Sequence, residues 1–138
     1  MANLKDKYCI VGVGETEFSK NSGRTTRAMA VEAVRKAILD AGLKGSDVDG
    51  MLSYQNGDST FAPFVAPDLG IRLNFYMDVV GGGSSTEALI GLAMGAIEAG
   101  MCNTVALFRS MNGYTEFRIG GTGARAAQPV RGADLAQV

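Results

Sequence analysis

The segment with the clearest capacity for chemistry is a glycine turn between a predicted strand and a predicted helix. Residues 81–87 read Gly-Gly-Gly-Ser-Ser-Thr-Glu, and a strand, a sharp turn and a helix start in this order form the geometry of a nucleophile elbow. Such a turn holds the first helical side chain above the edge of the sheet, at the positive end of the helix dipole. Ser84 occupies the nucleophile position.

Ser84 also fits a structural role. Ser84 and Glu87 have the spacing of a capping box, in which the serine caps the helix and the glutamate reaches back to it. A serine nucleophile needs an adjacent base, and the chain contains no histidine. Ser–His pairs, Cys–His pairs and His-ligated metals are therefore excluded within this sequence. Two roles stay open for Ser84: a cap or oxyanion-side group, and a nucleophile.

The composition indicates one globular domain and argues against several classes of function. The chain has 138 residues, of which 46% are hydrophobic and 20% charged, and its formal net charge is −1. This balance does not suggest a basic nucleic-acid-binding face. Cys9 and Cys102 are too few for a disulfide scaffold or a four-thiolate zinc site, so we expect both to pack in the core.

The chain also lacks the sequence signals of export and membrane insertion. Its first residues contain no apolar region of signal-peptide length. The longest apolar run, residues 88–97, is about half of what spans a bilayer. We therefore expect a cytoplasmic protein without a membrane segment or a metal.

The hydrophobic pattern predicts alternating strands and helices. The expected strands lie at residues 8–13, 48–54, 74–80 and 104–108, and the expected helices run from Thr25 or Thr26 to Ala41, near 61–69 and over 84–99. This alternation predicts an α/β layered fold with a mainly parallel sheet. Residues 1–110 form the predicted core. The glycine-rich residues 111–138 are predicted to be a surface loop or the start of an insertion.

The helix expected over residues 84–99 has no polar face between residues 88 and 97. A helix that is apolar all round must be covered on all sides. Gly91 and Gly95 lie four residues apart, so a second helix could approach closely along that stripe. Because a chain of this length has little material for such cover, we expect a second sheet, a second half-domain or a partner subunit to supply it.

Other glycine and arginine patterns are weaker signals of nucleotide binding. Gly12-Val13-Gly14 follows a predicted strand, but the dinucleotide fingerprint needs a third glycine and an immediately following helix. Residues 120–125 are rich in glycine yet lack the Lys-Ser/Thr of a P-loop. Arg109 and Arg118 could meet a phosphate or could be solvated charges. A small nucleotide-binding module stays a third hypothesis.

In combination, these segments resemble the N-terminal half of thiolase-superfamily proteins of the sterol carrier protein-type branch. Residues 9–18, Cys-Ile-Val-Gly-Val-Gly-Glu-Thr-Glu-Phe, are similar to the first strand and loop of that family. The match continues through residues 28–50, the glycine turn and helix at 81–100, and the strand at 104–108. The resemblance covers nearly the whole chain, but the family's second half, which holds its catalytic histidine and second cysteine, has no counterpart in this sequence.

The resemblance implies a fold and an assembly. In the family, two similar halves form a five-layered αβαβα architecture, and the resemblance places residues 84–99 as one of its buried central helices. It implies that the strand at 74–80 pairs with its counterpart in a second subunit, which would make a homodimer. It also implies a small partner protein with a zinc ribbon and an OB fold, because some thiolase-like proteins work with such a partner.

The resemblance also implies a reaction. It places Ser84 where a condensing thiolase carries its acyl-accepting cysteine, and a serine without a base cannot form the usual thioester intermediate. Some thiolase-like proteins without that cysteine are retro-aldol lyases on acyl-CoA thioesters, for example in steroid side-chain removal. We therefore expect aldol-type cleavage of an acyl-CoA substrate, with Gly82, Gly83 and Ser85 beside the substrate and no covalently bound cofactor.

Two alternatives remain beside the lyase. The protein could be an acetyl-CoA C-acyltransferase, the thiolase activity of the family in lipid degradation. It could also be a non-catalytic thiolase-like subunit that only dimerises. In every case the general base and acid would come from the missing half, so the 138-residue chain alone is expected to be inactive.

Overall fold

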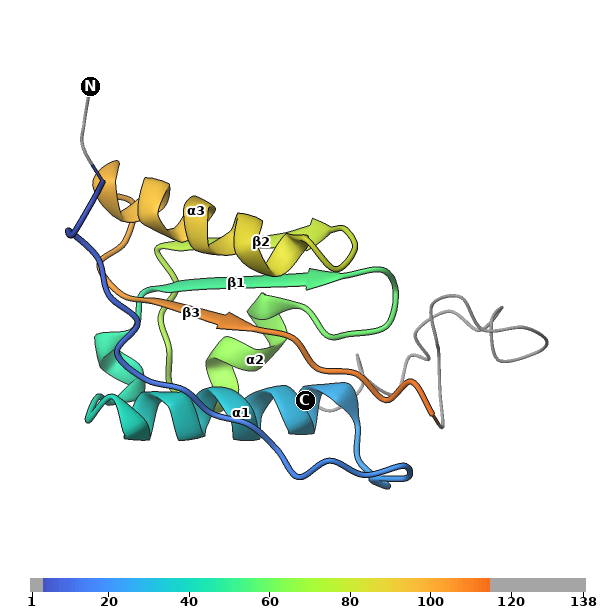
Figure 1. Cartoon of the computed structure of the whole chain (residues 1–138). Helices are drawn as coiled ribbons and strands as arrows, with labels where there is room; N and C mark the ends of the chain where they lie inside the picture. Colours follow the sequence, from blue (N-terminus) through green and yellow to red (C-terminus); the bar gives the residue numbers. More distant parts are fainter. Residues whose placement is uncertain (1–3, 115–138) are drawn as a thin grey trace.

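The computed structural model describes residues 4–114, which form a three-layered α/β structure (Figure 1). Along the chain these residues form α1 (Thr26–Asp40), the 3-10 helix η1 (Gly45–Asp47), β1 (Gly50–Gln55), α2 (Ala62–Asp68), β2 (Phe75–Val80), α3 (Ser85–Glu98) and β3 (Val105–Phe108). From residue 25 onward this is the order that the sequence predicts, except that η1 was not predicted. Of the predicted loop at 111–138, only residues 111–114 are described. The rest of the loop, which includes Arg118, lies outside the described residues.

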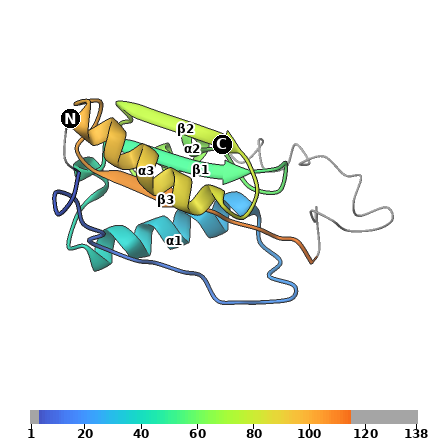
Figure 2. The ribbon, with the colours of Figure 1, turned by 45° about the horizontal axis from the view of Figure 1, so that its top comes forward.

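The strands form a parallel sheet in the order β2-β1-β3 (Figure 2). β1 is the central strand: its register with β2 runs from Gly50 opposite Phe75 to Gln55 opposite Val80, and Gly50 also lies opposite Val105 of β3. Because the strands are parallel, all their carboxyl ends lie at one edge of the sheet. The loops that follow the strands therefore meet at that edge.

The helices cover both faces of this sheet, with α1 and α2 on one side and α3 on the other (Figures 1 and 2). Successive residues of β1 point to opposite faces, so Met51 packs with Val34 of α1 and Val65 of α2 in the larger core. Leu52 packs with Leu89 and Ala93 of α3 in the smaller core. The sheet thus separates two hydrophobic clusters.

One face of α3 is covered and the other is open. Leu89, Ala93 and Ala96 are buried against the sheet, whereas Ile90, Gly91 and Gly95 on the opposite side are exposed among the described residues. The expectation that α3 is covered on all sides therefore remains a prediction for the complete protein. Within residues 4–114, none of the helices has the length and apolar character needed to cross a membrane.

The amino ends of the three strands are tied together by one carboxylate. Asp49 Oδ1 accepts hydrogen bonds from the backbone nitrogens of Asn103 and Thr104 at 2.8 and 2.9 Å. Its Oδ2 accepts from the side-chain amides of Asn103 at 2.9 Å and Asn74 at 3.3 Å. Burial raises the pKa of Asp49, but these hydrogen bonds outweigh it and hold the pKa below its usual value.

The short helix α2 is fixed by side chains from outside it. Asp78 of β2 accepts a hydrogen bond from the backbone nitrogen of Ala62 at 2.9 Å, which supplies a cap that Phe61 does not provide. At the other end, Arg27 of α1 holds Asp68 through two bonds of 2.8 Å. Arg27 is only 7% exposed, whereas the Asp68 side chain is 37% exposed, so a buried guanidinium joins α1 to an exposed carboxylate at the end of α2.

The predicted strand at residues 8–13 is wrong. This segment is extended but forms no strand, and it crosses the outside of α1 (Figure 1). Its Val13 nitrogen donates to Asp40 Oδ2 at 2.9 Å, and Ile10 is 73% exposed. The β-branched residues carry strand propensity, but a strand also needs a neighbouring strand to bond with, and no strand among the described residues pairs with them.

The same segment explains Gly12-Val13-Gly14 and corrects the prediction for Cys9. A Cβ at Gly12 would lie 2.2 Å from the Ala37 carbonyl oxygen, and one at Gly14 would lie 2.2 Å from that of Ala33. Both glycines therefore allow the chain to touch the α1 backbone. Cys9 is exposed rather than part of the core, whereas Cys102 is buried as predicted.

Candidate functional site

The turn that joins β2 to α3 lies at the carboxyl edge of the sheet, where open α/β sheets bind their ligands. The Gly81 nitrogen donates to the carbonyl oxygen of Gln55 at 3.2 Å, which ties the turn to the end of β1. The Ser85 nitrogen donates to the carbonyl oxygen of Gly82 at 3.0 Å, which closes the turn. Sequence reasoning therefore placed this turn correctly between a strand and a helix.

Ser84 does not cap α3, so the predicted capping box is wrong. Its backbone is already helical, with φ −72° and ψ −5°, and its side chain makes no capping hydrogen bond. A capping residue normally has an extended backbone, as Thr25 has at the start of α1. Thr25 has ψ 156°, and its hydroxyl accepts from the Ala28 nitrogen at 3.1 Å. Ser84 is exposed, so its hydroxyl is accessible beside the turn.

The predicted substrate contacts divide into two groups. Gly82 and Gly83 are exposed, and a Cβ at either position would meet no atom within 4 Å. They leave open space next to Ser84. Ser85 is 7% exposed, and its hydroxyl fills the place of a Cβ at Gly81, which would lie 2.1 Å from it. The structure thus brings Ser84, Gly82 and Gly83 together on the surface and turns Ser85 inward.

Sequence reasoning missed a group of buried polar residues at this edge. They lie at or just after the ends of β1 and β3, are at most 6% exposed, and comprise Gln55, Asp58, Ser59, Thr60 and Ser110. The hydroxyl oxygens of Ser59 and Ser110 lie 3.2 Å apart, while the buried Thr60 hydroxyl has no hydrogen-bond partner among the described residues. The sequence does contain a signal for this group, because polar residues directly follow two mainly apolar strands.

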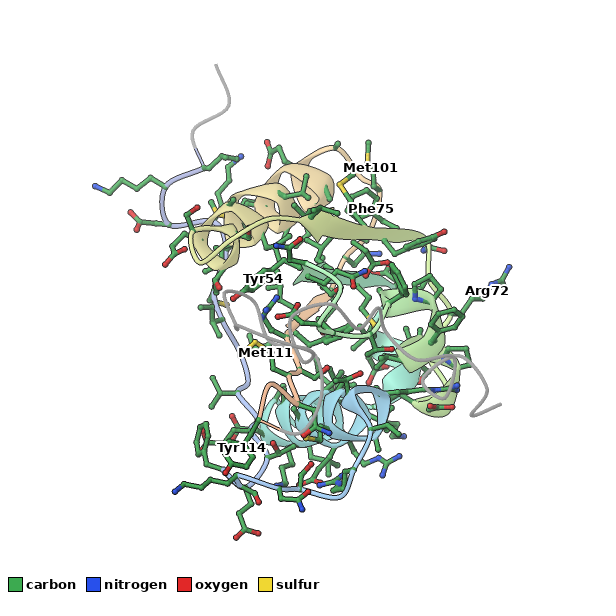
Figure 3. The ribbon with its side chains drawn as sticks, turned by 90° about the vertical axis from the view of Figure 1, so that its right-hand side faces the viewer. Tyr54, Arg72, Phe75, Met101, Met111 and Tyr114 are labelled. Atoms are coloured by element: carbon green, nitrogen blue, oxygen red, sulfur yellow. The ribbon has the colours of Figure 1, made fainter. Side chains whose placement is uncertain are left out.

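Arg109 contacts this group through Asp58 and is neither a solvated charge nor free for a phosphate. Its side chain is 16% exposed and pairs with the carboxylate of Asp58. One guanidinium nitrogen donates to the Tyr54 carbonyl oxygen at 2.9 Å, and the guanidinium carbon lies 4.1 Å from the centre of the Tyr54 ring. Figure 3 views the molecule from this edge, with Tyr54 on the side of α3.

Neither cysteine lies at the turn. Cys102 follows the carboxyl end of α3, at the opposite end of that helix from Ser84. Burial and the nearby charge of Asp49 raise the pKa of the Cys102 thiol, which keeps it protonated and unreactive near neutral pH. A Cβ at Gly50 would lie 3.0 Å from its sulfur, so this cysteine packs against the start of β1.

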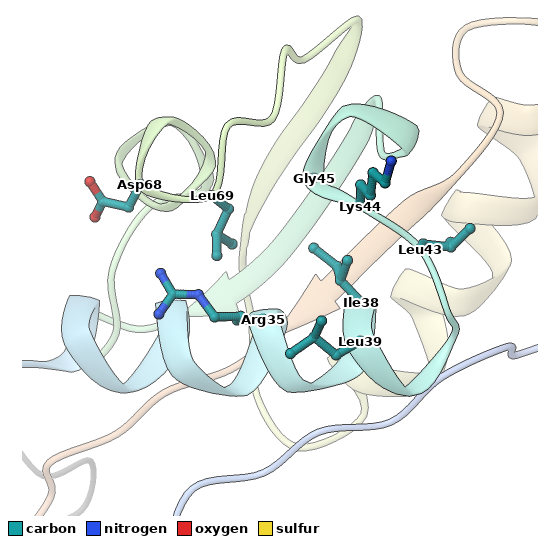
Figure 4. A pocket seen from close by; sticks show the side chains of 8 residues that line it. All are labelled: Arg35, Ile38, Leu39, Leu43, Lys44, Gly45, Asp68 and Leu69. Carbon is teal, nitrogen blue, oxygen red and sulfur yellow. The ribbon is translucent and has the colours of Figure 1, made fainter.

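A surface cavity of about 370 Å³ lies elsewhere, between the end of α1, η1 and α2 (Figure 4). Its floor is aliphatic, with Ile38, Leu43 and Leu69, and Arg35 and Lys44 stand at its sides. No residue predicted to act in the site lines this cavity.

Comparison with curated proteins gives two relatives of related activity. Over 137 residues the chain is 39% identical to a steroid side-chain-cleaving aldolase of Thermomonospora curvata, a match that covers 99% of this chain. Over 118 residues it is 37% identical to a 17-hydroxy-3-oxo-4-pregnene-20-carboxyl-CoA lyase of Mycobacterium tuberculosis, covering 85% of this chain. The chain spans about a third of the length of these relatives, 34% and 30% respectively. No protein-family model matches the chain.

Two solved structures share this fold. An Ltp2–ChsH2(DUF35) aldolase superposes with a TM-score of 0.72 at 40% identity, over 83% of this chain and 30% of that one. A monomeric SCP2-thiolase-like protein of type 1 from Mycobacterium smegmatis superposes with a TM-score of 0.60 at 25% identity, over 71% of this chain and 22% of that one. Sequence and structure comparisons thus point to the same group of proteins.

Proposed function

Because this chain is a thiolase-like protein that corresponds to an N-terminal half, we propose that the complete protein cleaves a carbon–carbon bond of an acyl-CoA thioester by a retro-aldol reaction. The observation that carries the proposal is the turn itself. An accessible serine stands at the start of α3 where a thiolase would need a thiolate. The similarity to an aldolase and a CoA lyase supports the same reaction.

The contribution of this chain to such a reaction is electrostatic. In a retro-aldol step a base takes the proton of the β-hydroxyl group, the Cα–Cβ bond breaks, and a ketone leaves. The bonding electrons remain as the enolate of the shortened acyl-CoA, which an acid then protonates. Backbone N–H groups at the start of a helix lack intrahelical partners. Those at the start of α3 would stabilise the negative oxygen of the enolate, with the base and acid supplied by the rest of the protein.

We propose a bulky substrate for this site. The lyase relative is named for a substrate whose 17-hydroxyl group is β to the carboxyl carbon of its CoA ester, which is the arrangement that a retro-aldol step requires. Gly82 and Gly83 leave the approach to Ser84 open, and this supports an acyl group with a branched or polycyclic β-carbon. The substrate of the complete protein is therefore proposed to be a β-hydroxyacyl-CoA of the steroid side-chain type, a step of steroid degradation.

An assay of the full-length protein tests the reaction. With a β-hydroxyacyl-CoA of this type, we expect release of a ketone and a shortened acyl-CoA, and we expect the Ser84→Ala variant to keep activity within about tenfold of the wild type, because Ser84 forms no covalent bond to the substrate. The competing acyltransferase needs Ser84 as an acyl acceptor. Thiolysis that depends on free CoA and disappears in Ser84→Ala would overturn the lyase in favour of that alternative.

The proposed assembly is a cytoplasmic homodimer that also binds a small zinc-ribbon and OB-fold protein. Among the described residues no strand pairs with the outer edge of β2, where Tyr76 is 53% and Val80 is 78% exposed. An open edge of this kind accepts a further strand. The aldolase structure above carries two component names, Ltp2 and ChsH2(DUF35), and this supports the proposal of a protein partner. Sedimentation of the complete protein tests whether it is a dimer.

Calorimetry of the complete protein with an acyl-CoA tests the alternative of a non-catalytic subunit. That alternative predicts no binding of the acyl-CoA.

A further inference from the structure

A partly buried, ion-paired arginine stands beside the candidate site. The Arg109 side chain is 16% exposed, and that of its partner Asp58 is 3% exposed. Asp58 in turn accepts a hydrogen bond from the Asn56 nitrogen at 3.0 Å, so the pair fixes the loop after β1. Burying a guanidinium is costly even when it is paired, and an apolar pair of the same volume is often as stable. The position therefore suggests a role beyond stability.

The first connection from Arg109 to the turn runs through the backbone. Arg109 Nη1 donates to the Tyr54 carbonyl oxygen at 2.9 Å, and that carbonyl belongs to the same planar peptide group as the Gln55 nitrogen. The Gln55 carbonyl oxygen is the acceptor for the Gly81 nitrogen at 3.2 Å. The backbone carbonyl bound by Arg109 and the one that anchors the turn therefore belong to consecutive residues of β1, Tyr54 and Gln55.

The second connection runs through the Tyr54 ring. The guanidinium carbon of Arg109 lies 4.1 Å from the centre of this ring, within the range of a cation–π contact. Tyr54 also packs against the cluster that contains Leu89 and Ala93 of α3. The ring is thus held between Arg109 and the inner face of α3, and Leu89 lies one helical turn after Ser85. The two connections reach the turn from β1 and from α3.

We propose that Arg109 is the positioning residue of this site, an inference that rests on the proposed function. It holds the end of β1 and the inner face of α3 so that the N–H groups at the start of α3 stay where the enolate oxygen develops. It does not touch the substrate. Binding of the large CoA ester depends little on this alignment, whereas the transition state depends on it strongly. Loss of Arg109 therefore lowers kcat rather than raising KM.

The test compares two ion-paired arginines of low exposure in the full-length protein. Arg109→Met removes the hydrogen bonds and the charge near the turn, and Arg27→Met is the matched control, since Arg27 is buried and paired with Asp68 between α1 and α2. In Arg109→Met we expect hydrogen exchange at the hydrogen-bonded amides of Gly81 and Ser85 to accelerate at least about tenfold relative to Arg27→Met. We also expect kcat to fall about tenfold to a hundredfold, with KM within about threefold of the wild type.

A lysine variant adds a graded comparison. Arg109→Lys keeps the charge but loses the planar fork that reaches Tyr54 and Asp58 together, so its kcat and exchange rates should lie between those of the wild type and Arg109→Met. If Arg109→Met does not fold, the exchange rates and kcat of Arg109→Lys are compared with those of Arg27→Lys instead.

The outcomes separate the inference from the proposed function. Equal acceleration of exchange at the Gly81 and Ser85 amides in both arginine variants overturns the inference, as does a loss of kcat/KM that comes from KM alone. If the wild-type protein has no retro-aldol activity on acyl-CoA substrates, the proposed function fails. The exchange comparison still decides whether Arg109 fixes the turn.

Discussion

At the scale of single residues, two hydroxyl side chains at helix starts have different roles. Thr25 caps α1 through the Ala28 nitrogen, and Ser84 has a helical backbone and no capping bond. We expect Thr25→Ala to lower the free energy of unfolding by about 1 kcal/mol, and Ser84→Ala to change it by less than about 0.5 kcal/mol. Urea unfolding of the two variants measures the difference. A loss in Ser84→Ala as large as that in Thr25→Ala would show that Ser84 does cap α3.

The glycines of the turn also differ, although the sequence presents them as a uniform run. A Cβ at Gly81 would lie 2.1 Å from the Ser85 hydroxyl oxygen and 3.3 Å from the Ser85 Cβ, whereas one at Gly82 would meet nothing within 4 Å. Gly81→Ala should therefore cost about 1–3 kcal/mol, because the buried Ser85 must move. Gly82→Ala should stay within about 0.5 kcal/mol of the wild type. Equal unfolding midpoints for the two alanine variants would contradict this arrangement.

Residue-scale prediction from sequence succeeded where the signal was local and failed where it was not. The turn at 81–83 is visible because glycines interrupt an apolar strand and a helical pattern follows them. The contact of Arg109 with Tyr54 joins residues 55 positions apart, and no local pattern indicates it. The capping box at Ser84 failed because spacing alone does not fix the backbone angles of the first helical residue.

At the scale of elements, Asp49 connects all three strands, and its effect depends on pH. Its carboxylate accepts four hydrogen bonds from the segments before β2 and β3, so its pKa in the folded protein lies below the unfolded value of about 3.9. The stabilisation is therefore fully present above that value and is lost as the pH falls through the folded-state pKa.

This dependence predicts the behaviour of Asp49→Asn. The amide retains only one acceptor oxygen, so we expect the variant to lose about 1–3 kcal/mol of unfolding free energy near neutral pH. The difference from the wild type should shrink in acid, where the native carboxyl is also protonated. Urea unfolding over a pH series measures both effects. A difference that stays constant from neutral to strongly acidic pH would contradict the role given to Asp49.

The elements themselves were largely predictable, with one informative exception. β1, β2 and β3 were recognised because short, mainly apolar runs lie between turn residues, and α1 because its buried Ala30, Val34 and Ile38 recur at helical spacing. Residues 8–13 have the same strand composition but no strand beside them. Whether such a segment forms a strand depends on which edge is free in the folded protein, and this information is not local.

At the scale of the whole molecule, the described residues expose apolar surface on more than one side. In the N-terminal segment Val11 is 56%, Val13 70% and Phe18 88% exposed. Gly12 and Gly14 face α1, so the alternating Val11 and Val13 point away from it. Together with the open side of α3, this segment leaves apolar surface exposed on two sides of the described residues.

We therefore expect the chain of 138 residues alone to self-associate and to lack activity. Light scattering over a concentration series should show species larger than a monomer. The double variant Val13→Ser with Phe18→Ser should reduce them, because it removes two of the most exposed apolar side chains of the segment. Leu39→Ser is the matched control: Leu39 is 67% exposed but lies on α1, apart from this segment, and single exposed apolar residues are tolerated. A monodisperse monomer at all concentrations would show that the N-terminal segment and α3 need no further cover.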